Sequence, residues 1–387
     1  GQTGCNPLMH IILQTLAGEV PRSLEVSPES TVADLKQIVY ESEPALLGVS
    51  LSLVFDAINL LDGADDKRVV DCRISDGSTL YLIKEYIGII LTASEDTTSK
   101  IWNATTAECI QTLCGHTAEV LTARFSADGD SVVTASEDKT AKTWHAVSGE
   151  CTNTFLGHSD RVQSAVFSPD GSSVLTASFD GTAIIWDAAT GECRNILSGH
   201  AGNLYCAEYS ADGSLALTAS ADKTAKIWNA LTGACMQTLE GHSADVMSAV
   251  FSFDRSSVLT ASEDGTARIW SASTGECIMT LSQQGCGGLA SAVFSADGSL
   301  VLAACDSGAA KIWNAATGEE MRKLLEDGSW CLGDPLISAV FSAHGSSILT
   351  AAGCDGAKVF SIADGCVREQ TLSGHAGSVN SAVFYEP

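Results

Sequence analysis

Tryptophan recurs along this chain with a period of 42 residues. The period holds for five positions, and a sixth tryptophan follows after 43 residues: Trp102, Trp144, Trp186, Trp228, Trp270 and Trp313. The segments around each tryptophan are similar too, and the third copy contains the residues Val-Leu-Thr-Ala-Ser before Trp186 and Thr-Gly-Glu-Cys after it. A period of this length indicates a repeat architecture, in which each repeat is one supersecondary unit.

Within one repeat, the apolar residues alternate with the period of a β-strand. Residues 173–178 alternate, the turn residues Asp180 and Gly181 interrupt the pattern, and residues 183–186 resume it. No stretch offers an uninterrupted helical pattern of ten residues, which argues against paired helices. We therefore expect four strands in each repeat, called a to d. In the third copy they are 164–168, 173–178, 182–187 and 192–197.

The repeats resemble the WD40 β-propeller family over residues 87–387. The Gly-His pair of that family is found five times, with its histidine at His116, His158, His200, His242 and His375. The Trp-Asp pair is intact at Trp186 and Asp187, and elsewhere the second residue is Asn, His or Ser. The resemblance implies a propeller, which is a ring of four-stranded sheets called blades.

The two ends of the repeat region complement each other. The first repeat begins with strand b at Ile87 and lacks strand a, whereas the chain ends with an additional strand a at 378–384. If these segments share one sheet, the ring has seven blades and blade 1 joins the two ends. Such closure leaves no free sheet edge between the first and last repeats. We expect a mainly β fold, with a closed seven-bladed propeller at 87–387.

The resemblance also implies a hydrogen-bonded tetrad in a blade, made by a His, a strand-b hydroxyl, an Asp and a Trp. Five sets match, one in each of blades 1 to 5: His375, Thr92, Asp96 and Trp102; His116, Thr134, Asp138 and Trp144; His158, Thr176, Asp180 and Trp186; His200, Thr218, Asp222 and Trp228; His242, Thr260, Asp264 and Trp270. Five copies favour a structural role over a catalytic or metal site, because an active site normally occurs once. Blades 6 and 7 depart from the pattern, with Gln284, Ala303 and Ser307 in blade 6, and Asp327, Cys354 and Phe360 in blade 7.

The end of the ring that carries the b–c turns and the d–a connections is expected to be open to partners. Positions there resemble the peptide contacts of the family, and Phe179, Tyr205 and Met247 would form an aromatic and adaptable patch for a basic or apolar peptide. The expected partner-binding residues are Leu121, Glu137, Phe179, Tyr205, Met247, Glu263, Trp330 and Ile337. Two alternatives remain: scattered surface apolar residues are normal, and the longer connection 326–335 around Trp330 is either drift in a redundant repeat or an interface anchor.

The net charge indicates which class of partner to expect, and the cysteine content indicates the cellular compartment. The formal net charge is −26, which argues against nucleic acid and membrane partners and favours proteins. No apolar run approaches the ~20 residues that span a bilayer. Fourteen cysteines are too few for a disulfide scaffold. Five keep the 42-residue register and are expected to be buried thiols in the cytoplasm or nucleus: Cys109, Cys151, Cys193, Cys235 and Cys277.

Residues 9–84 lack the repeat and are expected to form a separate α+β domain. Strands are predicted within 9–18, 22–26, 51–55 and 79–84, and a helix begins at the capping box formed by Thr31 and Asp34. This order corresponds to a β-grasp, and motifs such as Thr15-Leu-Ala-Gly and Leu60-Leu-Asp-Gly look like ubiquitin. Residues 1–8 are interpreted as an upstream remnant or disordered leader.

The ubiquitin-like resemblance implies a recognition surface at Leu16, Val54, Tyr81 and Ile83. The terminal Gly-Gly of ubiquitin is absent, which excludes conjugation. An exposed apolar patch marks a binding surface. The alternative, that the patch packs against the propeller, stays open because the connection between the domains is so short.

Together these features predict a non-enzymatic interaction scaffold. The open face of the propeller would bind one protein or peptide and the ubiquitin-like domain a second, with the ubiquitin–proteasome system as one context. The alternative is an architectural subunit of a larger assembly with no ubiquitin-related role. No nucleophile elbow, phosphate loop or metal-ligand spacing stands outside the repeats, so we expect no catalytic residue, cofactor or metal. The oligomeric state stays open.

Overall fold

The computed structural model describes residues 9–15, 22–27, 29–35, 49–55, 58–59, 74–75, 79–86, 88–282, 287–324, 336–342, 345–352, 356–361 and 369–385. The chain divides into two compact units, residues 1–87 and residues 88–387. Each unit has its own β-sheets.

The second unit consists of seven antiparallel sheets of four strands. In blades 1 to 4 the strands are, in the order a to d: β33 (Val379–Tyr385), β6 (Ile89–Ser94), β7 (Thr98–Asn103) and β8 (Cys109–Cys114); β9 (Val120–Phe125), β10 (Ser131–Ser136), β11 (Ala141–His145) and β12 (Cys151–Phe155); β13 (Val162–Phe167), β14 (Ser173–Ser178), β15 (Thr182–Asp187) and β16 (Cys193–Ser198); β17 (Leu204–Tyr209), β18 (Leu215–Ser220), β19 (Thr224–Asn229) and β20 (Cys235–Glu240). In blades 5 to 7 they are: β21 (Val246–Phe251), β22 (Ser257–Ser262), β23 (Thr266–Ser271) and β24 (Cys277–Ser282); β25 (Leu289–Phe294), β26 (Leu300–Cys305), β27 (Ala310–Asn314) and β28 (Glu320–Leu324); β29 (Leu336–Phe341), β30 (Ser347–Ala352), β31 (Gly356–Ser361) and β32 (Glu369–Leu372).

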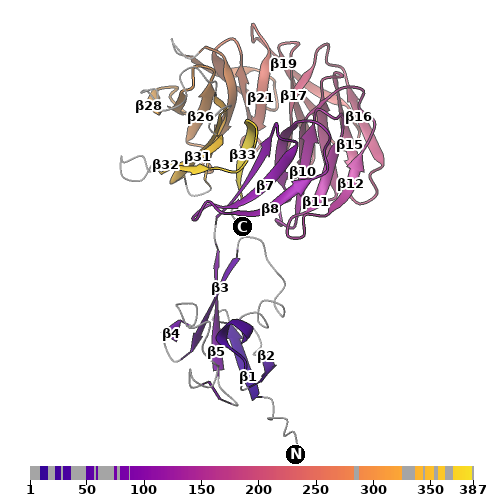
Figure 1. Cartoon of the computed structure of the whole chain (residues 1–387). Helices are drawn as coiled ribbons and strands as arrows, with labels where there is room; N and C mark the ends of the chain where they lie inside the picture. Colours follow the sequence, from indigo (N-terminus) through magenta and orange to yellow (C-terminus); the bar gives the residue numbers. More distant parts are fainter. Residues whose placement is uncertain are drawn as a thin grey trace, which may run out of the picture. The chain divides into compact units, whose positions relative to one another are not determined.

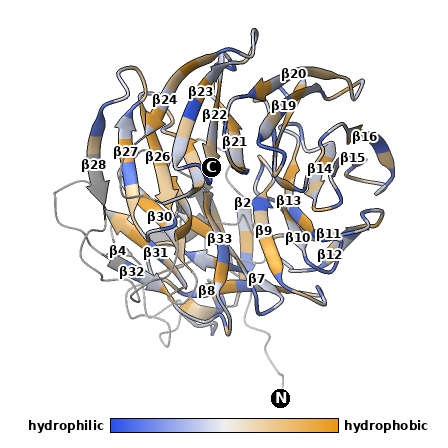
Figure 2. Ribbon diagram, turned by 90° about the horizontal axis from the view of Figure 1, so that it is seen from above, coloured by the Kyte–Doolittle hydropathy of each residue, from blue (hydrophilic) through white to orange (hydrophobic). Residues whose placement is uncertain are grey.

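These sheets form a closed ring. Figure 2 shows them around a central axis, with strands such as β9, β13 and β21 on the inside and β12, β16 and β20 on the outside. The last strand, β33, pairs antiparallel with β6, and the two ends of this unit lie side by side in Figure 1. Strands β29 and β30 of blade 7 and β9 of blade 2 contact β33 from its two sides. Blade 1 therefore joins the beginning of the repeat region to its end.

The hydrophobic core lies between neighbouring blades. One cluster packs Val133 and Ala135 of blade 2 against Val162 and Trp186 of blade 3. The cluster at the closure packs Leu349 of blade 7 against β6, β7 and β33 of blade 1. Many of the core residues are alanines with no exposed surface, and their small side chains let adjacent sheets approach closely.

Every blade carries a β-bulge at the start of strand a. In blade 3, Val162 pairs with Ser178 and Ser164 with Ala177, so that Gln163 is an extra residue. The corresponding extra residues in the other blades are Asn380, Leu121, Tyr205, Met247, Ala290 and Ile337. A bulge re-aims the side chain of its extra residue, and the sequence pattern of alternation did not reveal it.

The first unit contains a five-stranded sheet with the order β2-β1-β5-β3-β4. Its strands are β1 (Met9–Thr15), β2 (Arg22–Val26), β3 (Val49–Phe55), β4 (Ile58–Asn59) and β5 (Thr79–Tyr86). Strands β1 and β5 are parallel. Residues 32–35 are helical, and Thr31 and Asp34 cap this turn reciprocally: the Thr31 N–H donates to Asp34 Oδ2 at 2.8 Å and the Asp34 N–H to Thr31 Oγ1 at 3.1 Å.

The prediction that the five cysteines in register are buried is wrong. All five are exposed and free of disulfides. Each is the first residue of a strand d, which is the outermost strand of its blade and has no neighbour on one side.

Strand b of blade 1 also begins at Ile89 rather than Ile87. No helix in the described residues is long and apolar enough to cross a membrane.

Candidate functional site

The side chains of each predicted tetrad lie within hydrogen-bond distance of one another. In the five sets, the His Nδ1 to Asp Oδ2 distance is 2.7–2.9 Å. The His Nε2 to Thr Oγ1 distance is 2.7–2.8 Å. The Trp indole N–H donates to the same Thr oxygen at 2.8–2.9 Å. Each Thr is fully buried.

The direction of these hydrogen bonds follows from the donors available. Because an ionised Asp can only accept, His158 Nδ1 must donate to Asp180, and Nε2 of the neutral ring is then an acceptor. The Thr176 hydroxyl donates to that nitrogen and accepts from the Trp186 N–H. The same order of donors and acceptors in all five sets makes each tetrad a chain of buried polar groups whose hydrogen bonds are all satisfied.

The glycine before each tetrad histidine has a packing role. A Cβ atom on Gly157 would lie 3.0 Å from the Trp186 ring, and the corresponding glycine of blade 2, Gly115, has φ +153° and would bring its Cβ to 3.1 Å from Trp144. A larger residue would displace the indole from its bond to threonine. The glycine of the Gly-His pair therefore leaves room for the indole, most tightly in blades 1, 2, 3 and 5 and with an ordinary 3.4 Å contact in blade 4.

Burial and hydrogen bonding set the charges of the tetrads. Burial lowers the pKa of His158, His200, His242 and His375, although the bond to Asp opposes this effect. Burial alone would raise the pKa of Asp96, but hydrogen bonds from Thr98, the Ala376 N–H and His375 outweigh it and lower the pKa to about 2. These four tetrads thus pair a neutral imidazole with a carboxylate at neutral pH.

We expect stability to decrease as the pH falls below about 6.5. In the unfolded chain these histidines regain their ordinary pKa of about 6.5 and take up protons that the folded state excludes. The unfolded state then binds more protons, so each histidine lowers the free energy of unfolding by at most about 1.4 kcal/mol per pH unit, down to its folded pKa. Urea unfolding midpoints between pH 7.5 and 5 measure this slope. His158→Gln should reduce it, whereas His145→Gln, at an exposed position outside the tetrads, should not; a midpoint independent of pH would contradict the expectation.

Blades 6 and 7 lack parts of the tetrad. In blade 6, Ala303 is buried in the place of the threonine and Ser307 is exposed in the place of the aspartate. In blade 7, Thr350 is buried and donates to the Lys358 carbonyl at 3.5 Å, while Phe360 replaces the tryptophan. Gln284, Asp327 and Cys354 lie outside the described residues. Repetition and burial indicate that the tetrads are structural. Among the described residues no group of three or more His, Cys, Asp or Glu could hold a metal ion.

A connected row of side chains lies at the b–c end of the ring and joins four blades. Arg161 Nη1 donates to Glu137 Oε1 at 2.6 Å, and its guanidinium carbon lies 3.8 Å from the centre of the Phe179 ring. Phe179 meets Tyr205 edge to face with 5.3 Å between the ring centres. The Tyr205 hydroxyl donates to Asp245 Oδ2 at 2.9 Å. We call these five residues the aromatic row.

Backbone bonds explain how the row is assembled. In blades 1 to 6, the residue before the b–c turn donates its N–H to the carbonyl of the residue just before strand a, as Phe179 does to Arg161 and Glu137 does to Glu119. Each bulge then places its extra residue, here Tyr205, beside this pair. The sequence analysis named Glu137, Phe179 and Tyr205 but missed Arg161 and Asp245. The sequence did contain a signal for these two residues. The residue type just before strand a differs from blade to blade, and is Glu119, Arg161, Asn203 and Asp245 in blades 2 to 5.

The other predicted contact residues differ in how much of their surface is exposed. Met247 occupies the bulge of β21, next to β17 with Tyr205, and is partly buried. Leu121 is only 8% exposed and offers little surface. Ile337 is partly buried and Glu263 is exposed. Trp330 lies outside the described residues.

Two groups of carboxylates lie at the ends of the aromatic row and include its acidic members Glu137 and Asp245. Burial and the neighbouring Glu137 and Glu95 raise the pKa of Glu119. Burial and the neighbouring Asp245 and Asp306 raise the pKa of Glu263. Because neighbouring negative charges disfavour the ionised form of each carboxyl, a cation bound near either group would stabilise it.

Comparison with known proteins gives a family match. The family model described as "WD domain, G-beta repeat" matches five segments, which cover just over half of the chain: residues 107–145, 149–187, 191–229, 233–271 and 275–314. Each match begins at strand d of one blade and ends with strand c of the next, so the repeat in sequence is offset from the sheet in space. No curated protein matches the chain.

Proposed function

The chain belongs to the WD40 repeat family, and from this premise we propose that its seven-sheet unit is a non-enzymatic scaffold for protein–protein interactions. WD40 domains generally bind proteins and are usually not enzymes. The partner we propose is a peptide segment that combines basic and apolar side chains and binds over the aromatic row at the b–c end of the ring.

The aromatic row carries this proposal, because it is where the repeats stop being alike. The position of Phe179 is Glu95, Glu137 and Glu263 in blades 1, 2 and 5, and the position of Tyr205 is Gln163 in blade 3. The fold does not need these exchanges, since neighbouring blades form the same strands without them. Aromatic and arginine side chains are also the residue types that dominate binding energy at interfaces.

The flanking carboxylates define the partner's charge. Glu137, at one end of the row, is grouped with Glu95 and Glu119, and Asp245, at the other end, is grouped with Glu263 and Asp306. Arg161 already shows how a guanidinium is held there, between a carboxylate and an aromatic face. A peptide with arginine or lysine on either side of an apolar residue would complement this surface, and its association should weaken with salt.

A peptide-display selection with the full chain as bait tests the proposal. We expect the selected peptides to combine Arg or Lys with an apolar residue. Tyr205→Ala should weaken their binding about tenfold or more, as loss of an interface aromatic does, and Glu263→Lys should weaken it by charge reversal. Phe253→Glu, at an 85% exposed position in an a–b turn, is the control and should bind normally. Selection of acidic peptides, or binding that survives both changes, would contradict the proposal.

For the first unit we propose a ubiquitin-like fold that binds a second protein. The support is its sheet order β2-β1-β5-β3-β4 with a parallel β1/β5 pair and a capped helical turn at 31–35. Val54 is the register partner of Tyr81, and Ile83 follows two positions along β5; Leu16 lies outside the described residues. A second assay measures capture of the full chain by an immobilised ubiquitin-receptor domain. In this assay Val54→Ala should weaken capture and Tyr205→Ala should not. Absence of capture by the native chain would remove this part alone.

A further inference from the structure

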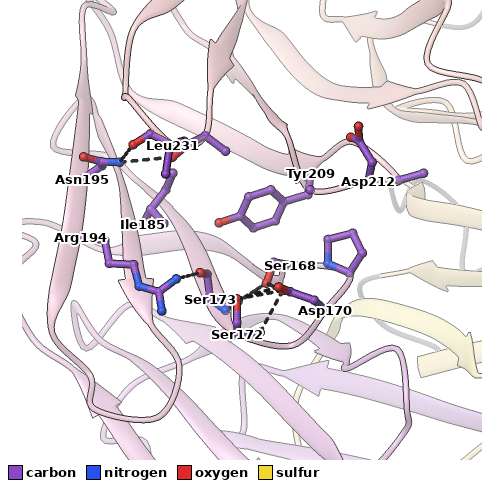
Figure 3. Close-up of a pocket in the computed structure, with 14 residues that line it drawn as sticks. Ser168, Asp170, Ser172, Ser173, Ile185, Arg194, Asn195, Tyr209, Asp212 and Leu231 are labelled. Atoms are coloured by element: carbon purple, nitrogen blue, oxygen red, sulfur yellow. Dashed lines mark hydrogen bonds between the residues drawn. The ribbon is translucent and has the colours of Figure 1, made fainter.

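A polar groove between blades 3 and 4 lies away from the aromatic row, because the a–b turns of both blades line it. Its volume is about 590 Å³, and its lining includes Ser173, Ile185, Arg194, Asp212, Tyr209 and Leu231. Figure 3 shows the Tyr209 ring crossing the groove, with its hydroxyl pointing to the side where Ile185, Arg194 and Ser173 lie.

The Tyr209 hydroxyl is the first unusual feature of this groove. Tyr209 is only 7% exposed, and its hydroxyl has no hydrogen-bond partner among the described residues. Burial raises the pKa of this phenol, so it stays protonated and able to donate. Phenylalanine takes this place in the six other blades: Phe125, Phe167, Phe251, Phe294, Phe341 and Phe384. The hydroxyl is therefore an addition that the fold does not require.

Arg194 is the second unusual feature. At its position in strand d, blades 1, 2, 4, 5 and 6 have the uncharged residues Ile110, Thr152, Met236, Ile278 and Met321, and blade 7 has the acidic Glu369. The Arg194 guanidinium donates to Ser173 Oγ at 2.5 Å and to Asp187 Oδ2 at 2.6 Å. A guanidinium has five N–H donors, so further donors remain beyond these two bonds. Two residues that break the repeat, 15 positions apart in sequence, thus line the same groove.

A second groove between another pair of blades allows a comparison within the same chain. A groove of about 520 Å³ lies between blades 5 and 6 and is lined by the corresponding residues, including Ser257, Ile269 and Phe294. There the places of Tyr209 and Arg194 are taken by Phe294 and Ile278. The hollow and its serine and aspartate lining are common to both grooves, and the Tyr209 hydroxyl and the Arg194 guanidinium distinguish the groove between blades 3 and 4.

We propose that this groove binds an uncharged amide, such as the side chain of a glutamine or asparagine in a peptide. The donors of Tyr209 and Arg194 call for an acceptor, which the amide carbonyl supplies. Asp170 and Asp212 line the same groove; both accept from serine hydroxyls and Asp212 also pairs with Arg255, but a carboxylate has further lone pairs that can accept the N–H groups of the amide. Asp170, which has no ion-pair partner among the described residues, disfavours an anionic acceptor. Ile185, Leu231 and the Tyr209 ring provide apolar walls for the rest of the side chain.

An NMR titration of the full chain with N-acetylglutamine methylamide tests this assignment. For so small a probe we expect saturable binding in the millimolar range, with shifts at the residues that line the groove. Tyr209→Phe and Arg194→Ile should each weaken binding about tenfold, as the loss of one or two buried hydrogen bonds does. Both variants place in blades 3 and 4 the residues that blades 5 and 6 already contain, so the fold should persist. The leucine derivative should produce no saturable shift.

Three results would overturn the proposal. The first is no saturable shift with the glutamine probe, which would mean that water alone fills the groove. The second is equal affinity in Tyr209→Phe, Arg194→Ile and the native chain. The third is tighter binding of N-acetylglutamate methylamide, which would identify an anion site instead.

Discussion

Deletion of residues 378–387 is expected to leave a chain that aggregates or unfolds at room temperature. Strand β33 has six register partners in β6, and its backbone hydrogen bonds contribute roughly 3–9 kcal/mol at about 0.5–1.5 kcal/mol each. The deletion also removes Val379 and Ala382 from the core between blades 7 and 1. This loss is comparable to the roughly 5–15 kcal/mol by which proteins are stable. It also exposes β6 as an unpaired edge, which favours aggregation.

The measurement is soluble yield together with the thermal unfolding midpoint. Deletion of residues 386–387 alone is the control and should leave both unchanged, because β33 ends at Tyr385. A synthetic peptide of residues 376–387, added during refolding, should restore part of the yield by completing blade 1. A soluble product of the longer deletion with an unchanged midpoint would show that closure does not hold the ring together.

Thr176→Val is expected to destabilise the protein by about 2–5 kcal/mol, although it exchanges a hydroxyl for a methyl group of similar size. The hydroxyl serves two buried partners, since it accepts from Trp186 Nε1 and donates to His158 Nε2. Each partner left without a hydrogen bond in the interior costs about 1–3 kcal/mol. The loss should appear as a lower urea midpoint.

Thr350→Val in blade 7 is the matched control. Thr350 is equally buried, but the Phe360 side chain carries no N–H group, and among the described residues the Thr350 hydroxyl bonds to the Lys358 carbonyl at 3.5 Å. We expect a loss below about 1 kcal/mol, within the range of one ordinary hydrogen bond. Equal losses for the two variants would mean that burial of the methyl group, and not the tetrad, sets the cost.

The sequence determined the seven four-stranded sheets and the residues of the tetrads. These depend on patterns within 10 to 25 residues, such as the alternation in residues 173–178, the turn at Asp180 and the spacing of His158 from Thr176. Local periodicity dictates strands and turns directly, and repetition of the pattern made each inference testable several times within one chain.

The tertiary structure alone decided which side chains meet between blades and which remain exposed. The bulges that present Tyr205 and Met247 interrupt the alternation without a sequence signal. The contact of Arg161 with Phe179, and the convergence of Arg194 and Tyr209 on one groove, depend on how strands pair and neighbouring sheets pack. The five cysteines in register are exposed because strand d has no neighbour outside it. A repeat encodes its own strands, but burial and contacts depend on the place of each strand in the ring.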